Sequence, residues 1–465
     1  MRLSEVAVVV GGQLHGPDVQ ITGPAYVDSR SPVAEGLFVA IAGEHVDGHD
    51  YAAGAHAVLG SRPTEAPTVT VHDPVAALGV LARHIIDRLD ATVIAITGSQ
   101  GKTGTKDYLA GVLGALAGQD AVVATTGNNN NELGVPLTVL QADSSTTHLV
   151  VEMGARGIGH IAYLCQIAPP RIAAVLNVGT AHVGEFGSKA AIAQAKGEII
   201  EALPGDGIAV LNADDDVVAA MAPRTQATVV TFGQPAMVTW QHLETGPLGQ
   251  PAFDLVHAHE RHRVVLQQSG LHQLPNALAA AAAALGAGFG VAEVAAALST
   301  VTATSRWRME VTERSDGLVV INDAYNANPE SMNAALVALS DIGSGLAADV
   351  ARRTIAVLGP MYELGEQHDA GHRAVGHVAA LHADVLVVVG TEARGIALGA
   401  HEHPRPRVDE VIHTLDKAEA VAWLRHNAGS GDVVLVKASR GAALEWIAER
   451  LLAEDGIADN EESTR

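Results

Sequence analysis

Short apolar runs alternate with longer, alanine-rich segments of helical character through the middle of the chain, from residue 91 to about residue 303. Strands that alternate with helical segments of ~10 or more residues are typical of βαβ units around a mainly parallel sheet. We therefore expect a central parallel-sheet domain. The apolar runs that predict its strands are ATVIAIT (91–97), HLVVEM (148–153), RIAAVLNVG (171–179) and GIAVLNAD (207–214).

The two flanking regions show related patterns. Residues 315–465 repeat the alternation, with strand-like runs such as RTIAVLG (353–359) and ADVLVVVG (383–390), and predict a Rossmann-like α/β domain. Residues 1–88 mix short strand-like runs with turns and predict a small α/β domain. At ~150 residues per domain, a chain of 465 residues is too long for one core, and we expect three domains: 1–88, 89–312 and 313–465.

The charge and cysteine content exclude several classes of protein. The formal net charge of −23 argues against a nucleic-acid partner, because phosphates are bound through clustered Lys and Arg. No apolar run approaches the ~18 residues of a membrane helix, and the N-terminus lacks the pattern of a signal peptide. The single cysteine, Cys165, cannot form an internal disulfide. We expect a cytoplasmic protein with no membrane span and no nucleic-acid partner.

A glycine-containing turn, GSQGKT (98–103), joins the strand 91–97 to a helical pattern that begins near Lys102. Phosphate binding needs glycines so that backbone N–H groups can curl around the ligand. It also needs a Lys that reaches the β- and γ-phosphates and a hydroxyl that holds Mg²⁺. The segment has all three, so we predict a nucleotide site here. An ordinary strand-to-helix turn is the alternative.

This segment and several others resemble the Mur ligase family. TGSQGKTGTKD (97–107) is similar to the family's phosphate-binding loop, with Gly104 in place of the usual Thr. TTGNNNNELGVPLT (125–138), EMGARGIGHI (152–161) and AQAKGEI (193–199) follow in the family's order. The resemblance implies an ATP-dependent amide ligase that activates a carboxylate as an acyl phosphate.

A metal site is expected beside the nucleotide. Glu152 lies at the end of the strand 148–153, where a carboxylate can hold Mg²⁺ opposite Thr103. Taken alone, Glu152 could be a helix-start charge, His182 a surface histidine and Lys196 a solvated helical charge. The resemblance places Glu152, His182 and a carbamylated Lys196 around two magnesium ions, with carbon dioxide as the source of the carbamate. It makes Lys102, His182, Lys196 and Arg308 the catalytic residues.

The adenosine end of ATP is assigned through three further segments. Asn276 in HQLPNALAAAA (272–282) matches the family's base-contacting residue, although a helix cap is the ordinary role of such an Asn. SRWRMEV (305–311) resembles the family's domain junction, with Trp307 in place of Gly, and Arg308 could instead form a structural salt bridge. The nucleotide residues implied are Gly98, Ser99, Gln100, Gly101, Lys102, Thr103, Gly104, Asn276, Asp323, Asn326 and Asn328.

The string DAYNANP (323–329) is typical of the Mur ligase that adds D-alanyl-D-alanine, and its two Asn residues could otherwise be turn residues. VDSRSPVAEGLFVAIAGEHVDGHDY (27–51) resembles the family's uridine-domain signature, so the first domain is expected to bind UDP. VKASRG (436–441) resembles a segment that contacts the incoming dipeptide. The substrate-binding residues implied are Ser29, Arg30, Thr125, Thr126, Asn128, Asn130, Asn131, Lys437, Ser439 and Arg440.

The resemblance therefore implies a monomeric enzyme of peptidoglycan precursor synthesis. Its substrates would be ATP, UDP-N-acetylmuramoyl-tripeptide and D-alanyl-D-alanine. One alternative is another amide ligase of the superfamily, such as the diamino-acid-adding enzyme or a folylpolyglutamate synthase, against which DAYNANP argues. The other is a nucleotide-binding scaffold without catalysis. Retention of Lys102, Thr103, Glu152, His182 and Lys196 together argues against it, because a binder needs no such metal shell.

Overall fold

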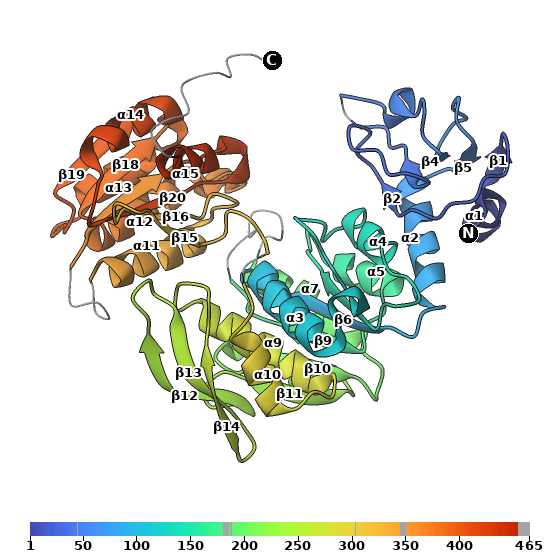
Figure 1. Cartoon of the computed structure of the whole chain (residues 1–465), viewed down its shortest axis with the longest axis horizontal. Coiled ribbons are helices and arrows are strands. Elements are labelled where there is room, and N and C mark those ends of the chain that lie inside the picture. Colours follow the sequence, from blue (N-terminus) through green and yellow to red (C-terminus); the bar gives the residue numbers. More distant parts are fainter. Residues whose placement is uncertain (44, 180–185, 187, 303, 345–350, 454–465) are drawn as a thin grey trace. The chain divides into compact units, whose positions relative to one another are not determined.

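Three β-sheets with flanking helices organise the described part of the chain in this computed structural model (Figure 1). The structure describes residues 1–43, 45–179, 186, 188–302, 304–344 and 351–453. The predicted α/β class is confirmed, as are the small N-terminal sheet, the larger central sheet and the Rossmann-like C-terminal sheet. No helix in the described part of the chain combines the length and apolar character that a membrane crossing needs.

The N-terminal sheet has five short strands in the order β1-β5-β4-β3-β2. Among the described residues of this sheet, β1 pairs antiparallel with β5, and the other pairs are parallel. Helix α2 begins after Asp73, whose carboxylate accepts hydrogen bonds from the N–H groups of Val75 and Ala76. Its buried Leu78 and Leu81 pack with Leu59 of the sheet. The elements are α1 (Leu3–Val10), β1 (Gln13–His15), β2 (Ala25–Tyr26), β3 (Leu37–Val39), β4 (Ala57–Gly60), β5 (Thr68–Thr70) and α2 (Pro74–Ile86).

The central sheet has nine strands in the order β14-β13-β12-β11-β10-β9-β6-β8-β7. The pairs from β7 to β11 are parallel, and β13 and β14 form an antiparallel hairpin. The parallel strands read as continuous apolar runs because helices cover both faces. The strands are β6 (Thr92–Thr97), β7 (Val122–Ala124), β8 (His148–Glu152), β9 (Ile172–Val175), β10 (Ile208–Asn212), β11 (Thr228–Phe232), β12 (Val238–Thr245), β13 (Pro251–His257) and β14 (Glu260–Val265). The helices are α3 (Lys102–Ala117), α4 (Gly134–Val139), α5 (His160–Ile167), α7 (Lys189–Glu201), α8 (Asp216–Ala219), α9 (Gln273–Gly286) and α10 (Val291–Leu298).

The C-terminal sheet has six strands in the order β15-β16-β20-β17-β18-β19, parallel except for the β15–β16 pair. One apolar cluster lies between the sheet and α11, α12 and α13, and a second lies between the other face and α14 and α15. The strands are β15 (Glu310–Glu313), β16 (Val319–Asn322), β17 (Arg353–Leu358), β18 (Val385–Val389), β19 (Glu410–Thr414) and β20 (Asp432–Lys437). The helices are α11 (Pro329–Gly343), α12 (His368–His382), α13 (Arg394–Glu402), α14 (Lys417–Asn427) and α15 (Glu445–Leu452).

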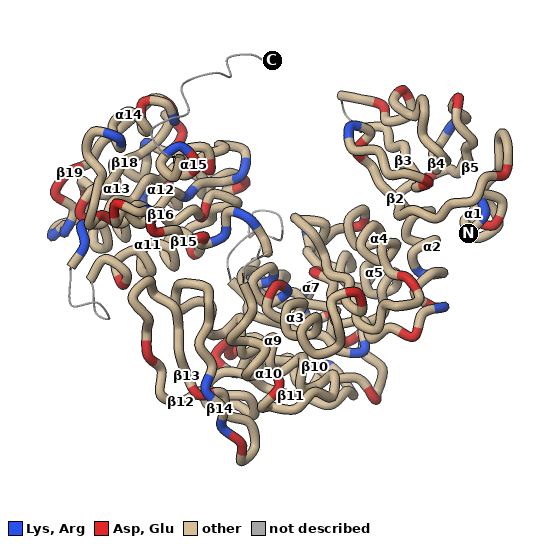
Figure 2. The backbone as a smooth tube through the Cα atoms, viewed as in Figure 1, with Lys and Arg blue, Asp and Glu red and all other residues tan. Residues whose placement is uncertain are grey.

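The contacts within the chain divide it into two units rather than three. The first unit holds the N-terminal sheet and the central strands β6 to β11, and the second holds β13, β14 and the C-terminal sheet. The domain boundaries predicted from the sequence, after residues 88 and 312, stay predictions. Figure 2 shows Lys and Arg residues spread along the whole tube, interspersed with Asp and Glu.

Helices α12 and α13 lie against each other at backbone distance, and glycines make this possible. A Cβ atom on Gly376 would lie 2.0 Å from the carbonyl oxygen of Ile396 and 2.8 Å from the amide nitrogen of Ala400. A Cβ atom on Gly399 would lie 2.0 Å from the carbonyl oxygen of Arg373. Because these neighbours are backbone atoms, they cannot move aside as a flexible side chain could.

Gly376→Ala should therefore destabilise the C-terminal sheet by about 2 kcal/mol, since overpacking outweighs the gain in helix propensity. Urea unfolding followed by tryptophan fluorescence measures this, because Trp307, Trp423 and Trp446 all lie in this part of the chain. Gly429→Ala is the matched control, because a Cβ atom there meets nothing within 4 Å. Equal stability of the two variants would contradict the packing argument.

Candidate active site

The glycine turn after β6 leads directly into α3, at the junction where the sequence predicts a nucleotide site. Gly101 precedes α3 with φ of +79°, a left-handed conformation that glycine adopts without strain. The turn therefore leads into the N-terminus of a 16-residue helix, where free N–H groups and the helix dipole favour an anion. The ammonium of Lys102 donates to the carbonyl oxygen of Gly98 at 2.7 Å, which folds the lysine back over the turn. Gly104 lies within the first turns of α3.

Asn177 holds this turn in place, a role that the sequence analysis missed. The carboxamide oxygen of Asn177 accepts from the N–H of Gln100 at 2.9 Å, and its amide donates to the Gln100 carbonyl at 3.1 Å. The N–H of Ser99 donates to the Asn177 carbonyl, and the Ser99 hydroxyl accepts from Gly179 N–H. Asn177 follows the strand beside β6, and that position after RIAAVL is the signal that could have identified it.

Lys196 lies on α7 with its side chain removed from water. The residue is 6% exposed, and its ammonium has no hydrogen bond or ion pair to any residue that the structure describes. Burial lowers the pKa of Lys196 well below its usual value, and the positive charge of Lys102 lowers it further. The two lysines that the sequence singled out are therefore neighbours, and the lowered pKa increases the neutral fraction of the Lys196 amine.

Glu152 ends β8, which is paired directly with β6, so it emerges at the same sheet edge as the glycine turn. Its backbone N–H donates to the Thr125 hydroxyl at 3.0 Å. Its carboxylate is buried, and Oε1 has no hydrogen-bond partner among the described residues. Thr103 is also buried, in the first turn of α3. His182 lies outside the described residues.

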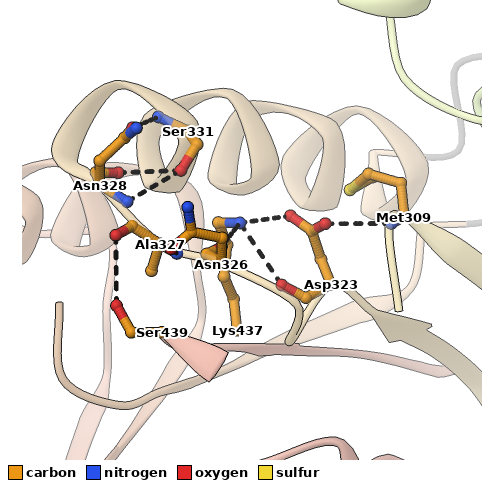
Figure 3. Close-up of polar contacts among 8 residues, drawn as sticks. All are labelled: Met309, Asp323, Asn326, Ala327, Asn328, Ser331, Lys437 and Ser439. Carbon is orange, nitrogen blue, oxygen red and sulfur yellow. Dashed lines mark hydrogen bonds and ion pairs between the residues drawn. The ribbon is translucent and has the colours of Figure 1, made fainter. Parts of the chain in front are cut away.

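Lys437 and Asp323 form a buried ion pair at the carboxyl ends of β20 and β16 (Figure 3). The ammonium of Lys437, 3% exposed, lies 2.6 Å from Asp323 Oδ2 and donates to the Asn326 carbonyl at 2.8 Å. The other oxygen of Asp323 accepts from the N–H of Met309 at 3.1 Å. The pair therefore ties together the junction before β15, the loop after β16 and the end of β20.

The remaining residues of that loop have mixed roles (Figure 3). Asn328 is the N-cap of α11: its carboxamide oxygen accepts from Ser331 N–H at 2.8 Å, and the Ser331 hydroxyl accepts from Asn328 N–H. Asn326 is exposed, and its carboxamide oxygen accepts from the N–H of its neighbour Ala327 at 2.8 Å. Ser439 is buried, and its hydroxyl accepts from the Tyr362 N–H at 2.9 Å and donates to the Ala327 carbonyl at 3.4 Å. Asn326 is thus the side chain of this loop best presented to a ligand.

Arg308 and Arg440 each lie over an aromatic ring. The guanidinium carbon of Arg308 is 4.1 Å from the ring centroid of Tyr325, and that of Arg440 is 4.3 Å from the ring of Trp307. The side chain of Arg440 is 49% exposed and pairs with Glu445. Stacking on aromatic faces fixes the direction of a guanidinium while its edge stays able to donate.

Asn276 lies in the first turn of α9 rather than at its cap, and its amide donates to the Gln273 carboxamide oxygen at 3.0 Å.

In the first domain, Arg30 is exposed and forms a bidentate contact with Asp28, whose pKa it lowers to about 2 through hydrogen bonds and charge. Ser29 lies beside it, partly buried.

The segment 125–131 presents some of its polar residues and uses others internally. Thr125 is buried, and the Asn131 carboxamide oxygen accepts from Gly134 N–H at 2.9 Å. The Asn130 carbonyl accepts from Gly154 N–H at 2.7 Å. Thr126 and Asn128 are exposed.

The candidate site residues fall into two groups. The glycine turn, Glu152 and Lys196 lie in one unit. The other unit contains Arg308, Asp323, Asn326 and Lys437.

Comparison with known proteins identifies the family. The Mur ligase middle domain matches residues 96–284, and the Mur ligase glutamate ligase domain matches residues 307–440. A protein of Mycobacterium tuberculosis named UDP-N-acetylmuramoyl-tripeptide–D-alanyl-D-alanine ligase is 43% identical over 98% of both chains. The protein of that name from Bacillus subtilis is 34% identical over 97% of this chain and 98% of its own.

Solved structures agree with this assignment. A crystal structure of MurF from Acinetobacter baumannii matches with a TM-score of 0.83 and 29% identity, over 97% of this chain and 98% of the other. A MurF ligase from Thermotoga maritima in complex with ADP matches with a TM-score of 0.78 and 30% identity, over 93% and 97% of the two chains. The chain therefore belongs to the Mur ligase family and is a ligase of that family's MurF branch.

Proposed function

We propose that this protein joins D-alanyl-D-alanine to the terminal carboxylate of UDP-N-acetylmuramoyl-tripeptide at the expense of ATP, giving the pentapeptide precursor of peptidoglycan, ADP and phosphate. The observation that carries the proposal is the glycine turn at the N-terminus of α3, together with a buried Lys196 and a Glu152 carboxylate whose Oε1 has no partner among the described residues. The name shared by relatives that match over nearly the whole chain supports the substrates.

The chemistry requires activation of a carboxylate, because oxide is too poor a leaving group for direct attack by an amine. One carboxylate oxygen of the tripeptide attacks the γ-phosphorus of ATP, ADP leaves, and an acyl phosphate forms. The amine of the dipeptide then attacks the acyl carbon and phosphate leaves. Catalysis of such phosphoryl transfer depends chiefly on positioning and charge neutralisation. The N–H groups of the turn and the Lys102 ammonium supply both at the phosphates.

Glu152 and Lys196 fit a magnesium site. A buried carboxylate oxygen is costly unless a hydrogen-bond donor or a cation satisfies it, and Glu152 Oε1 has neither among the described residues. Oxygen ligands are those that Mg²⁺ prefers. A neutral Lys196 amine can attack carbon dioxide, forming an N–C bond and releasing a proton, and its lowered pKa supplies that neutral amine. The carbamate would be a second anionic oxygen ligand, with Thr103 and His182 as further candidates. Magnesium bound there would neutralise charge on the phosphate oxygens.

The remaining residues are proposed to bind the ends of the substrates. Asn326 and Asn276 would contact the adenosine, and Arg308, held on Tyr325, would neutralise the transferred phosphate. Thr126 and Asn128 are the exposed members of the segment proposed to meet the muramoyl peptide. Asp323 and Asn328 would act by shaping the adenosine loop, since their side chains are engaged within the protein.

Release of phosphate from ATP tests the proposed function. It should require both UDP-N-acetylmuramoyl-tripeptide and D-alanyl-D-alanine, and mass spectrometry should find the pentapeptide product. Diaminopimelate with the UDP-linked dipeptide is the control that represents the diamino-acid-adding alternative. Turnover with that pair, or phosphate release without any acceptor, would contradict the proposal.

Lys102→Ala should lower turnover more than a hundredfold, because loss of a contact of ~3 kcal/mol at the developing phosphate charge has that effect on the rate. The measurement is kcat for phosphate release at saturating ATP. Lys189→Ala is the matched control, because Lys189 is an exposed lysine at the start of α7. Activity of Lys102→Ala above about 1% of the unchanged enzyme would rule out this role.

Lys196→Ala should be almost inactive. Acetate or formate should raise the activity of this variant at least about tenfold, because their carboxylate can replace the carbamate oxygens at the metal. Lys102→Ala serves as the control, because a carboxylate cannot replace a cation at the phosphates. Intact-protein mass measured under carbon dioxide should show an addition at Lys196. An unmodified Lys196 in fully active enzyme would refute the carbamate.

A further inference from the structure

Trp307 has a backbone conformation that a bulky residue rarely adopts. Its φ is +58°, in the left-handed region, and Met309 two residues later has φ of +49°. Glycine would occupy such a position without strain, whereas a side chain raises its energy. Backbone strain of this kind persists where the surrounding structure fixes it, and it is concentrated at functional sites. The large ring at residue 307 therefore calls for an explanation.

The ring of Trp307 is the surface on which Arg440 lies. The guanidinium carbon of Arg440 is 4.3 Å from the ring centroid, and that of Arg306 is 5.0 Å away. Nη1 of Arg440 also donates to Glu445 Oε1 at 2.5 Å. The ring of Trp307 and the carboxylate of Glu445 thus hold the Arg440 guanidinium, although the Arg440 side chain remains 49% exposed. The carbonyl of Trp307 accepts from Tyr325 N–H at 3.1 Å, which ties the backbone at Trp307 to the loop after β16.

Among the three residues at the end of β20 that were expected to contact the dipeptide, Arg440 alone offers an exposed cation. Lys437 is 2% exposed and its charge is matched by Asp323. Ser439 is 4% exposed, and its hydroxyl accepts from Tyr362 N–H. A guanidinium binds a carboxylate through parallel N–H donors and requires a defined orientation to do so. Arg440 meets that requirement through Trp307.

We propose that Trp307 is a positioning residue that orients Arg440 to receive the carboxylate of the incoming dipeptide. This inference rests on the proposed function and adds a specificity determinant to it. Trp307 does not touch the dipeptide in this account. Its effect reaches the substrate only through the direction of the Arg440 guanidinium.

The test compares Trp307→Gly, which keeps the backbone conformation and removes the ring, with Trp307→Phe, which keeps an aromatic face. Trp307→Gly should raise KM for D-alanyl-D-alanine roughly 3- to 10-fold, with kcat and KM for ATP changed by less than about twofold. Trp307→Phe should stay within about twofold of the unchanged enzyme. Arg306→Ala is the control, because Arg306 contacts the same ring without holding Arg440.

Two further measurements separate positioning from a merely structural role. The unchanged enzyme should prefer D-alanyl-D-alanine to its C-terminal amide, and Trp307→Gly should lose part of that preference. In an Arg440→Ala background, Trp307→Gly should have no further effect on KM. An unchanged KM and preference in Trp307→Gly, or effects that add in full, would overturn the inference alone. Absence of dipeptide-dependent turnover in the unchanged enzyme would overturn the proposed function and this inference with it.

Discussion

A charge removed from water needs a partner, and the described part of the chain meets this constraint in two different ways. Lys437 is matched within the protein by Asp323 and the Asn326 carbonyl, so it organises structure. Lys196 and Glu152 are just as deeply buried, yet Lys196 has no partner among the described residues and Glu152 Oε1 has none either. Since an isolated buried ion costs several kcal/mol, the second arrangement becomes favourable only when partners beyond the described residues satisfy these groups. The proposed magnesium ion and carbamate would satisfy both side chains.

Within each parallel sheet, polar groups that follow neighbouring strands lie together, because the carboxyl ends of those strands share one edge. In the central sheet, β6 delivers the phosphate turn, β8 delivers Glu152, and Asn177 after β9 holds the turn in place. In the C-terminal sheet, β16 and β20 deliver Asp323 and Lys437 by the same rule. In each sheet, the grouping of the candidate site residues therefore depends on strand order more than on any single loop.

The sequence predicted the sheets and the glycine turn between β6 and α3, because both follow from local patterns: continuous apolar runs, glycines at a strand end and a Lys-Thr helix start. The sequence could not predict which polar side chains form hydrogen bonds within the protein. Lys437 and Asn328 are expected at ligands, and the structure shows that they also form an ion pair and a helix cap. The ion pair joins residues far apart in sequence, which a local pattern does not reveal. Whether they also meet a substrate, the roles of the other site residues, the monomeric state and the cytoplasmic location stay predictions.

The central claim is that the tripeptide carboxylate is activated as an acyl phosphate before the amine attacks. Transfer of oxygen tests it most directly, using UDP-N-acetylmuramoyl-tripeptide whose terminal carboxylate carries ¹⁸O on both oxygens, with ATP and D-alanyl-D-alanine. Mass spectrometry of the products should find one labelled oxygen in the released phosphate and the other in the new amide carbonyl. Phosphate without label, formed together with the pentapeptide, would contradict the account.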